Sequence, residues 1–227
     1  MIRIKTYFKL VILTLVLTSI VVSGAFWYGT HNPNQKVIKD IEKEFHKKEV
    51  AEVIYLGLVQ PEYDYNTKET FIEATGKCVD FLNFTTDRKS RVPTSMIIAM
   101  AGIESAWGTS RFAKQGNALF GVRTWDLSTP HMKPLDLPDA DFGVKKYETK
   151  CDSVKDMIRI LNTHPAYSKL RNYRKLIGNP QKFVGHKFSR YLDKYAIIGF
   201  EYVKKINLMI KKNNLEKFNS LRFKLEN

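Results

Sequence analysis

The N-terminus carries an apolar run that is too long and too poor in charge for the surface of a globular domain. Residues 10–28 contain no charged side chain and follow the basic residues Arg3, Lys5 and Lys9. The most apolar, first part of the run has the length of a signal-peptide core, whereas the whole run is long enough to span a bilayer as a helix. A cleaved signal peptide and an uncleaved membrane anchor both remain open, and a buried globular helix is the third alternative. Either of the first two exports residues 31–227.

Export restricts which polyanionic partners this basic chain can meet. Its 37 Lys and Arg residues exceed its 23 Asp and Glu residues, so the formal net charge is +14. Such an excess favours polyanionic partners, namely nucleic acid, anionic lipid or acidic polymers of the cell envelope. An exported protein does not meet chromosomal DNA, so we expect no nucleic-acid partner and a periplasmic or cell-envelope location. Residues 10–28, if uncleaved, would anchor the protein in the inner membrane.

The cysteine content is also compatible with an exported protein. Cys78 and Cys151 are the only two cysteines. An even number of cysteines in an exported chain favours a disulfide, and two buried thiols are the alternative.

The five histidines are scattered, and the sequence has no P-loop, G-x-G-x-x-G, G-x-S-x-G or H-E-x-x-H motif. We therefore expect neither a metal nor a cofactor.

Apolar spacing indicates a mostly helical chain. Thr67 is placed to cap a helix that continues to Leu82, and residues 153–156 have the pattern of a capping box for a later helix. Residues 122–146 differ, because three prolines interrupt short β-prone pieces. The expected fold class is α+β and predominantly α-helical. Further helices are expected over residues 34–49, 93–107, 109–115, 180–195 and 200–212.

One predicted helix combines an apolar face with a carboxyl group. Ile97, Met100, Glu104 and Trp107 recur at helical spacing after Pro93, which places Glu104 on the stripe expected to face inward. Burial disfavours the charged form of a carboxyl group and raises its pKa, as a general acid working near neutral pH requires. The alternatives are that Glu104 lies at the rim of the stripe or pairs with a buried arginine.

The residues around this glutamate resemble a known signature. E-S-A-W-G-T-S-R-F-A at 104–113 and G-N-A-L-F-G at 116–121 are similar to the E-S-x-W-G-x-S-x-x-A…G-N-N-L-F-G pattern of bacterial glucosaminidases, the Bax-type and flagellar-autolysin family. Residues 161–171 are similar to the Bax-type members. Later matches are Tyr147 with Ser153, Tyr195-Ala196 and Tyr202-Val203. The resemblance covers about residues 90–212.

The resemblance implies a lysozyme-like fold, with a small β lobe beside an active-site cleft. It implies a monomeric endo-β-N-acetylglucosaminidase that cleaves the N-acetylglucosaminyl-β-1,4-N-acetylmuramic acid linkage of peptidoglycan glycan strands. Glu104 matches the general acid of the family, and Tyr195 matches a late tyrosine of the cleft, where it would orient the substrate's N-acetyl group or a water. Tyr195 could instead be a core tyrosine. The candidate substrate-binding residues are Trp107, Asn117, Phe120, Trp125, Tyr147 and Tyr167. Asn117 could instead fix a loop, and Trp107 could instead belong to the core.

The sequence departs from the family in the second carboxyl group. Glycosidases use two acidic groups, and the family's second one is proposed to be a Glu of the β lobe. Here that region offers only aspartates, of which Asp139 is the first choice by spacing; the others are Asp126, Asp136 and Asp141. Ile197 and Ile198 also replace polar or acidic residues of relatives. The substrate's own acetamido oxygen could instead act as the nucleophile.

Three functions follow as alternatives. A peptidoglycan hydrolase comes first, a lytic transglycosylase of lysozyme-like fold second, and a catalytically weak peptidoglycan-binding protein third. The expected organisation is an N-terminal signal or anchor over residues 1–30, a helical extension over 31–90, the catalytic domain over 91–213 and a basic tail over 214–227.

Overall fold

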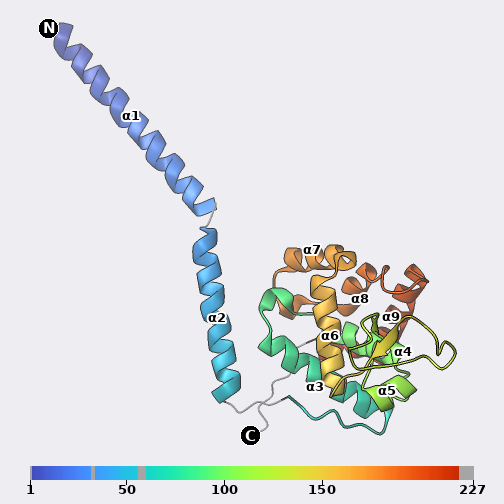
Figure 1. Cartoon of the computed structure of the whole chain (residues 1–227). Helices are drawn as coiled ribbons and strands as arrows, with labels where there is room; N and C mark the ends of the chain where they lie inside the picture. Colours follow the sequence, from blue (N-terminus) through green and yellow to red (C-terminus); the bar gives the residue numbers. More distant parts are fainter. Residues whose placement is uncertain (1, 32–33, 56–59, 220–227) are drawn as a thin grey trace. The chain divides into compact units, whose positions relative to one another are not determined.

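The computed structural model describes residues 2–31, 34–55 and 60–219, and the chain divides into two compact units, Met1–Glu49 and Val50–Asn227 (Figure 1). Helix α1 (Ile2–His31) belongs to the first unit, and α2 (Gln35–Tyr55) follows it. By length and composition α1 is able to cross a membrane, although a signal sequence meets the same criterion. Both predictions for the N-terminus therefore stay open.

The second unit is a helical bundle with a small sheet, which confirms the predicted fold class. Its sheet consists of β1 (Arg123–Thr124), β2 (His131–Met132) and β3 (Gly143–Lys145), in the order β1-β3-β2 with antiparallel pairs. Arg123 pairs with Val144, and His131 pairs with Lys145. The helices are α3 (Lys68–Thr85), α4 (Thr94–Glu104), α5 (Arg111–Gly116), α6 (Lys150–Thr163), α7 (Ser168–Ile177), α8 (Gly185–Phe188) and α9 (Phe200–Lys212).

Helix α4 lies at the centre of this unit. Every residue from Thr94 to Gly102 is buried, and α4 packs against α3, α8, α9 and the C-terminal 3₁₀ turn η5 (Leu215–Phe218). The expectation of one inward stripe is therefore wrong, because the helix has no outer face. Glu104 is the last helical residue and is exposed at the helix end.

Helix α3 shares the core with α4. Thr67 caps it as predicted, since its hydroxyl accepts from the Thr70 amide and Thr70 reciprocates. Phe71 and Cys78 are fully buried, and Cys78 forms a disulfide with Cys151 of α6, with their Cα atoms 5.8 Å apart. The disulfide prediction is thus confirmed. The compact unit begins well before residue 91, so part of the expected extension is integral to it.

The C-terminal end of the described chain is also packed. Leu215 and Phe218 are buried, and the Glu216 carboxylate accepts from the backbone amides of Gly185 (3.0 Å) and His186 (3.1 Å). The first residues of the expected tail therefore close the helical core. Residues 220–227 of that tail lie outside the described residues.

Two helix boundaries differ from the predictions. Helix α6 begins at Lys150, because Thr149 and Asp152 form the capping box, and the Ser153 hydroxyl instead accepts from the Leu119 amide at 3.0 Å. The segment 180–195 is not one helix but a series of short pieces, η3 (Pro180–Lys182), α8 and η4 (Ser189–Tyr191). The local patterns correctly predicted helical structure in these segments. Contacts with residues distant in the sequence determine which residues cap a helix and which pack against other elements.

The disulfide joins residues 73 positions apart, so its loss should release much chain entropy in the unfolded state. We expect the double variant Cys78→Ser/Cys151→Ser to have a free energy of unfolding lower by about 4 kcal/mol, as loop-closure entropy gives for a loop of this length. Urea unfolding of the oxidised wild type and the variant measures this difference. A loss below about 1 kcal/mol would show that the cross-link does not stabilise the fold by restricting the unfolded chain.

Candidate active site

Glu104 stands at the point where the buried helix meets solvent. Partial burial raises the pKa of its carboxyl group, and the nearby Tyr202 hydroxyl lowers it by less. The direction is the one predicted, although the cause is the helix end rather than an inward stripe. The group therefore keeps its proton to a higher pH than an ordinary glutamate does.

Tyrosines surround this carboxyl group. Tyr195 and Tyr202 stack with ring centroids 4.9 Å apart, and the Tyr195 hydroxyl donates to the Phe120 carbonyl at 3.0 Å. Burial raises the pKa of both tyrosines, and the nearby Glu104 charge raises them further. Tyr167 is buried beside them, and its pKa is raised by burial as well. The predicted residues Glu104, Tyr195, Phe120 and Tyr167 are thus brought together, and the raised pKa values of Glu104, Tyr195 and Tyr167 favour their neutral, protonated forms.

The turn after Glu104 has a strained backbone. Ala106 (φ 50°), Trp107 (φ 57°) and Gly108 (φ 80°) lie in the left-handed region. The Ser105 hydroxyl donates to the Ala101 carbonyl at 2.6 Å and accepts from the Gly108 amide at 2.8 Å. These bonds fold the turn back onto the end of α4 and so fix the backbone that carries Glu104.

A segment distant in sequence holds this turn from outside. The Tyr65 hydroxyl donates to the Gly108 carbonyl at 2.8 Å, and a Cβ at position 108 would clash with the Tyr65 ring. The Trp107 ring packs edge-on to Phe71 at 6.0 Å and under the Lys68 ammonium at 4.8 Å. Trp107 thus serves as packing in this structure. Sequence reasoning missed Tyr65, since no local pattern marks a contact over this separation.

Asn117 fixes a loop, although it was predicted among the substrate-binding residues. It ends α5 in the left-handed conformation. Its side-chain amide donates to the carbonyls of Tyr147 (3.1 Å) and Glu148 (2.8 Å), and its side-chain oxygen accepts from Lys150 Nζ at 3.1 Å. Both polar atoms of its side chain are thus engaged in joining α5 to the start of α6.

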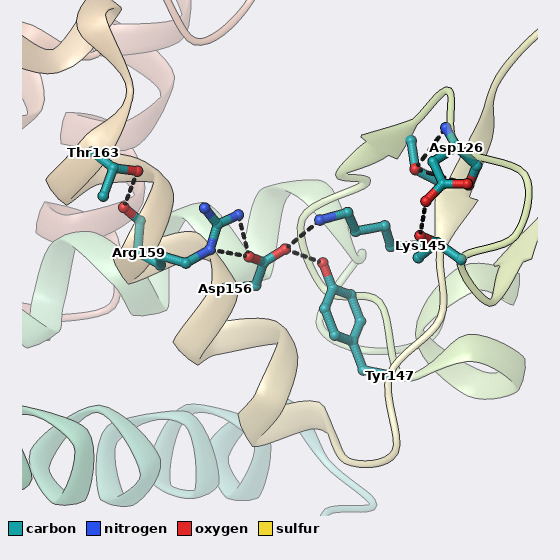
Figure 2. A network of polar contacts seen from close by, with 8 residues as sticks. Asp126, Lys145, Tyr147, Asp156, Arg159 and Thr163 are labelled. Carbon is teal, nitrogen blue, oxygen red and sulfur yellow. Dashed lines mark hydrogen bonds and ion pairs between the residues drawn. The ribbon is translucent and has the colours of Figure 1, made fainter.

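Asp156 joins the sheet to helix α6, as Figure 2 shows. Its Oδ2 accepts from the Tyr147 hydroxyl at 2.9 Å and from Lys145 Nζ at 3.2 Å, and its Oδ1 accepts from Arg159 Nε at 2.8 Å. Burial alone would raise the pKa of Asp156, but the hydrogen bonds from Arg159, Tyr147 and Lys145 outweigh it and lower the pKa. The hydroxyl of Tyr147, predicted to bind substrate, is therefore engaged in this network.

The aspartates of the β lobe differ in their engagement. Asp126 accepts from the Ser128 hydroxyl (2.6 Å) and the Thr129 hydroxyl (3.1 Å), and these bonds lower its pKa (Figure 2). It caps a turn. Asp136, Asp139 and Asp141 are exposed.

The exposed aromatic ring of the lobe is Trp125. It is 62% exposed, and its ring centroid lies 6.0 Å from that of Phe142. Of the predicted substrate-binding aromatics, it offers the most open ring face. Among the described residues, no group of three or more His, Cys, Asp or Glu side chains is placed to hold a metal ion.

Comparison with known proteins decides the family. A family model described as "Glucosaminidase: Mannosyl-glycoprotein endo-beta-N-acetylglucosaminidase" matches residues 85–215, more than half of the chain. The chain belongs to the glucosaminidase family. It is 36% identical to the protein bax of Escherichia coli (strain K12) over 88 residues, which are 39% of this chain and 30% of that protein. The match thus spans less than a third of the relative's length.

The fold of the glucosaminidase-family chain also has a solved counterpart. The catalytic domain of the autolysin Auto from Listeria monocytogenes aligns with a TM-score of 0.53 and 22% identity, over 75% of this chain and 96% of that domain. This likeness supports the lysozyme-like α+β fold. Tyr65, Phe71 and Cys78 lie before the residues that the family model matches, so residues outside the matched segment help to hold the turn after Glu104 and the core of this family member.

The network of Figure 2 leads to a stability prediction with a defined pH dependence. Asp156→Asn removes the charge that Lys145, Tyr147 and Arg159 share, so we expect the free energy of unfolding at pH 7 to fall by about 1–3 kcal/mol. Because the pKa of Asp156 is lowered in the fold, its stabilisation is present above the ordinary aspartate pKa of about 3.9 and is lost as the pH falls through the lowered value.

Urea unfolding of the wild type and Asp156→Asn, from neutral pH down to about pH 3, tests this sign. The difference between the two proteins should shrink toward acid. The control is Asp64→Asn, which changes an exposed aspartate and should leave the unfolding free energy unchanged. A difference that stays constant over the whole range would show that the charge of Asp156 does not stabilise the fold.

Proposed function

We propose that this protein is a peptidoglycan hydrolase, an endo-β-N-acetylglucosaminidase with Glu104 as its general acid. The observation that carries the proposal is the carboxyl group with a raised pKa at the exposed end of α4, in a chain of the glucosaminidase family. Such a group is protonated in the pH range where an ordinary glutamate is ionised, so it is able to donate a proton to the leaving glycosidic oxygen.

The neighbouring hydroxyls define what else the site does. The Tyr195 hydroxyl donates a hydrogen bond to the Phe120 carbonyl, so its oxygen is left to accept a hydrogen bond. We assign it the orientation of the substrate's acetamido N–H or of a water. Tyr202 is buried beside Glu104, and we assign it a part in orienting the acid.

The proposed setting is the cell envelope. An apolar α1 able to serve as a signal or an anchor, a basic chain and relatives that include a protein described as an autolysin support it. Attraction between the basic surface and acidic wall or membrane polymers would hold the enzyme near glycan strands. We propose that the protein acts there as a monomer.

Digestion of purified peptidoglycan with the full chain in detergent, followed by mass spectrometry, tests the reaction. We expect fragments with reducing N-acetylglucosamine ends. The variant Glu104→Gln should lower the rate at least about 100-fold, because the amide cannot donate the proton. Glu73→Gln, which changes an exposed glutamate of α3, is the matched control and should keep full activity.

Other products would identify another reaction. Anhydro-muramic ends would make the protein a lytic transglycosylase, and binding without fragments would make it a peptidoglycan-binding protein. The stability of Glu104→Gln separates catalysis from folding. A pKa raised in the fold means that deprotonation destabilises the protein, so the neutral glutamine should leave the melting temperature unchanged or higher.

The pH profile follows from the same shift. The protonated acid is the active form, so kcat should fall as the pH rises through the pKa of Glu104, on a limb that lies above the ordinary glutamate value of about 4.3. Glu73→Gln should retain this limb. A profile that is flat through the acidic and neutral range would refute Glu104 as the acid.

For the second carboxyl group we propose Asp139 of the β lobe. The Asp126 carboxylate is hydrogen-bonded to hydroxyls of its own turn, whereas Asp139 is exposed. Asp139→Asn should lower kcat about 100-fold, and Asp136→Asn and Asp141→Asn should have small effects in the same assay. If the variant with all three asparagines keeps its activity, the substrate's acetamido oxygen is the nucleophile and the assignment of Asp139 is wrong.

A further inference from the structure

A cavity lies apart from the residues that surround Glu104. It has a volume of about 500 Å³ and is formed by the beginning of α7, the α8–η4 segment and the beginning of α9. Its walls include Lys169, Arg190, Tyr191, Asp193, Phe200 and Asn207. The proposed reaction uses none of these residues, and only Lys169 among them lies in the segment 161–171 that is similar to the Bax-type members.

Three charged side chains of this cavity, Lys169, Arg190 and Asp193, form no ion pair with other described residues. The two cations are exposed. His186, which also lines the cavity, differs because it hydrogen-bonds to Glu216 at 2.9 Å. The cavity thus presents two available cations and one available carboxylate.

The remaining walls add a polar donor and apolar surface. Asn207 accepts from the Ser189 hydroxyl through its Oδ1 at 2.6 Å, which orients its amide nitrogen as a donor. Phe200 is 68% exposed, and the Tyr191 ring is held 5.1 Å from Tyr173. A ligand that fits must carry acidic groups, a basic group and apolar parts together.

The cavity adjoins the proposed active site through the chain. Lys169 follows Tyr167 by two residues, and Phe200 precedes Tyr202 by two, and both tyrosines interact electrostatically with Tyr195 near Glu104. Residues two apart on a helix point to different sides, so a sugar bound beside Glu104 would reach the cavity walls only through a long, extended substituent such as a peptide.

We infer that this cavity binds the short peptide that peptidoglycan carries on its muramic acid residues. Peptide carboxylates would pair with Lys169 and Arg190, a free amine would pair with Asp193, and alanine side chains would contact Phe200 and Tyr191. Anionic phosphate polymers lack the amine and the apolar groups, so they match only part of the site. The inference rests on the proposed function, since it names the part of that substrate which the cavity holds.

Binding is tested with synthetic N-acetylmuramyl tetrapeptide that contains a diamino acid, and with N-acetylmuramic acid alone, by calorimetry on the full chain in detergent. The wild type should bind the muramyl peptide more tightly than the bare sugar. Lys169→Ala/Arg190→Ala should weaken peptide binding about fivefold or more, since two partly exposed ion pairs are lost. The control Lys77→Ala/Lys211→Ala removes the same charge from exposed lysines elsewhere and should bind like the wild type.

Turnover on two forms of the polymer separates a peptide site from general charge. On native peptidoglycan the Lys169→Ala/Arg190→Ala variant should raise KM and keep kcat, whereas on glycan strands stripped of peptides by an amidase it should match the wild type. Equal losses on both polymers, or no preference of the wild type for the muramyl peptide, would overturn the inference. Preferential peptide binding without cleavage of either polymer would support the cavity and refute the proposed hydrolase.

Discussion

The arrangement of this protein depends on the complete burial of α4. A helix can lose contact with water on every side only if its side chains are apolar or small and its few hydroxyls are bonded, as in Thr94–Gly102. Full burial of side chains such as Ile97 or Met100 stabilises the fold by about 1.5–3 kcal/mol each. A charged group in the middle of such a helix would lose its hydration without compensation. A carboxyl group is tolerated only at an end, and Glu104 occupies that end. Its backbone is as rigid as the core, while its side chain reaches solvent.

The surrounding contacts maintain this end against backbone strain. Left-handed conformations at Ala106 and Trp107 each cost about 1–2 kcal/mol relative to the ordinary helical region, so the turn persists only because other contacts determine it. Tyr65 supplies one of these contacts through the Gly108 carbonyl, and Ser105 supplies another from within the turn. Strain next to a candidate acid is consistent with a position that function, rather than stability, has selected. The disulfide and the Asp156 network add support from α3 and from the sheet.

Sequence patterns located the chemistry better than the architecture. The signature around Glu104, the disulfide pair and the cap at Thr67 could be predicted, because each depends on local spacing or on residue type. The burial of α4 on all sides could not, since the same apolar periodicity fits a surface helix with one inner face. Ser153 matched a capping pattern but bonds to Leu119, and Tyr65 contacts Gly108 across a separation that no local rule spans. Partners distant in the chain decided each of these cases.

Charge is distributed over the unit in a way that suits two neighbouring but different tasks. The surroundings of Glu104 are tyrosine hydroxyls and aromatic rings, and a cation there would stabilise the carboxylate and lower the pKa that an acid needs. Cations are therefore best placed at a distance, where they do not ionise the acid but still attract an anionic polymer. Lys169 and Arg190 meet this condition, because both line the cavity apart from the residues around Glu104. Under the proposed function, the basic excess of the chain would act on binding, and the tyrosine surroundings would act on proton transfer.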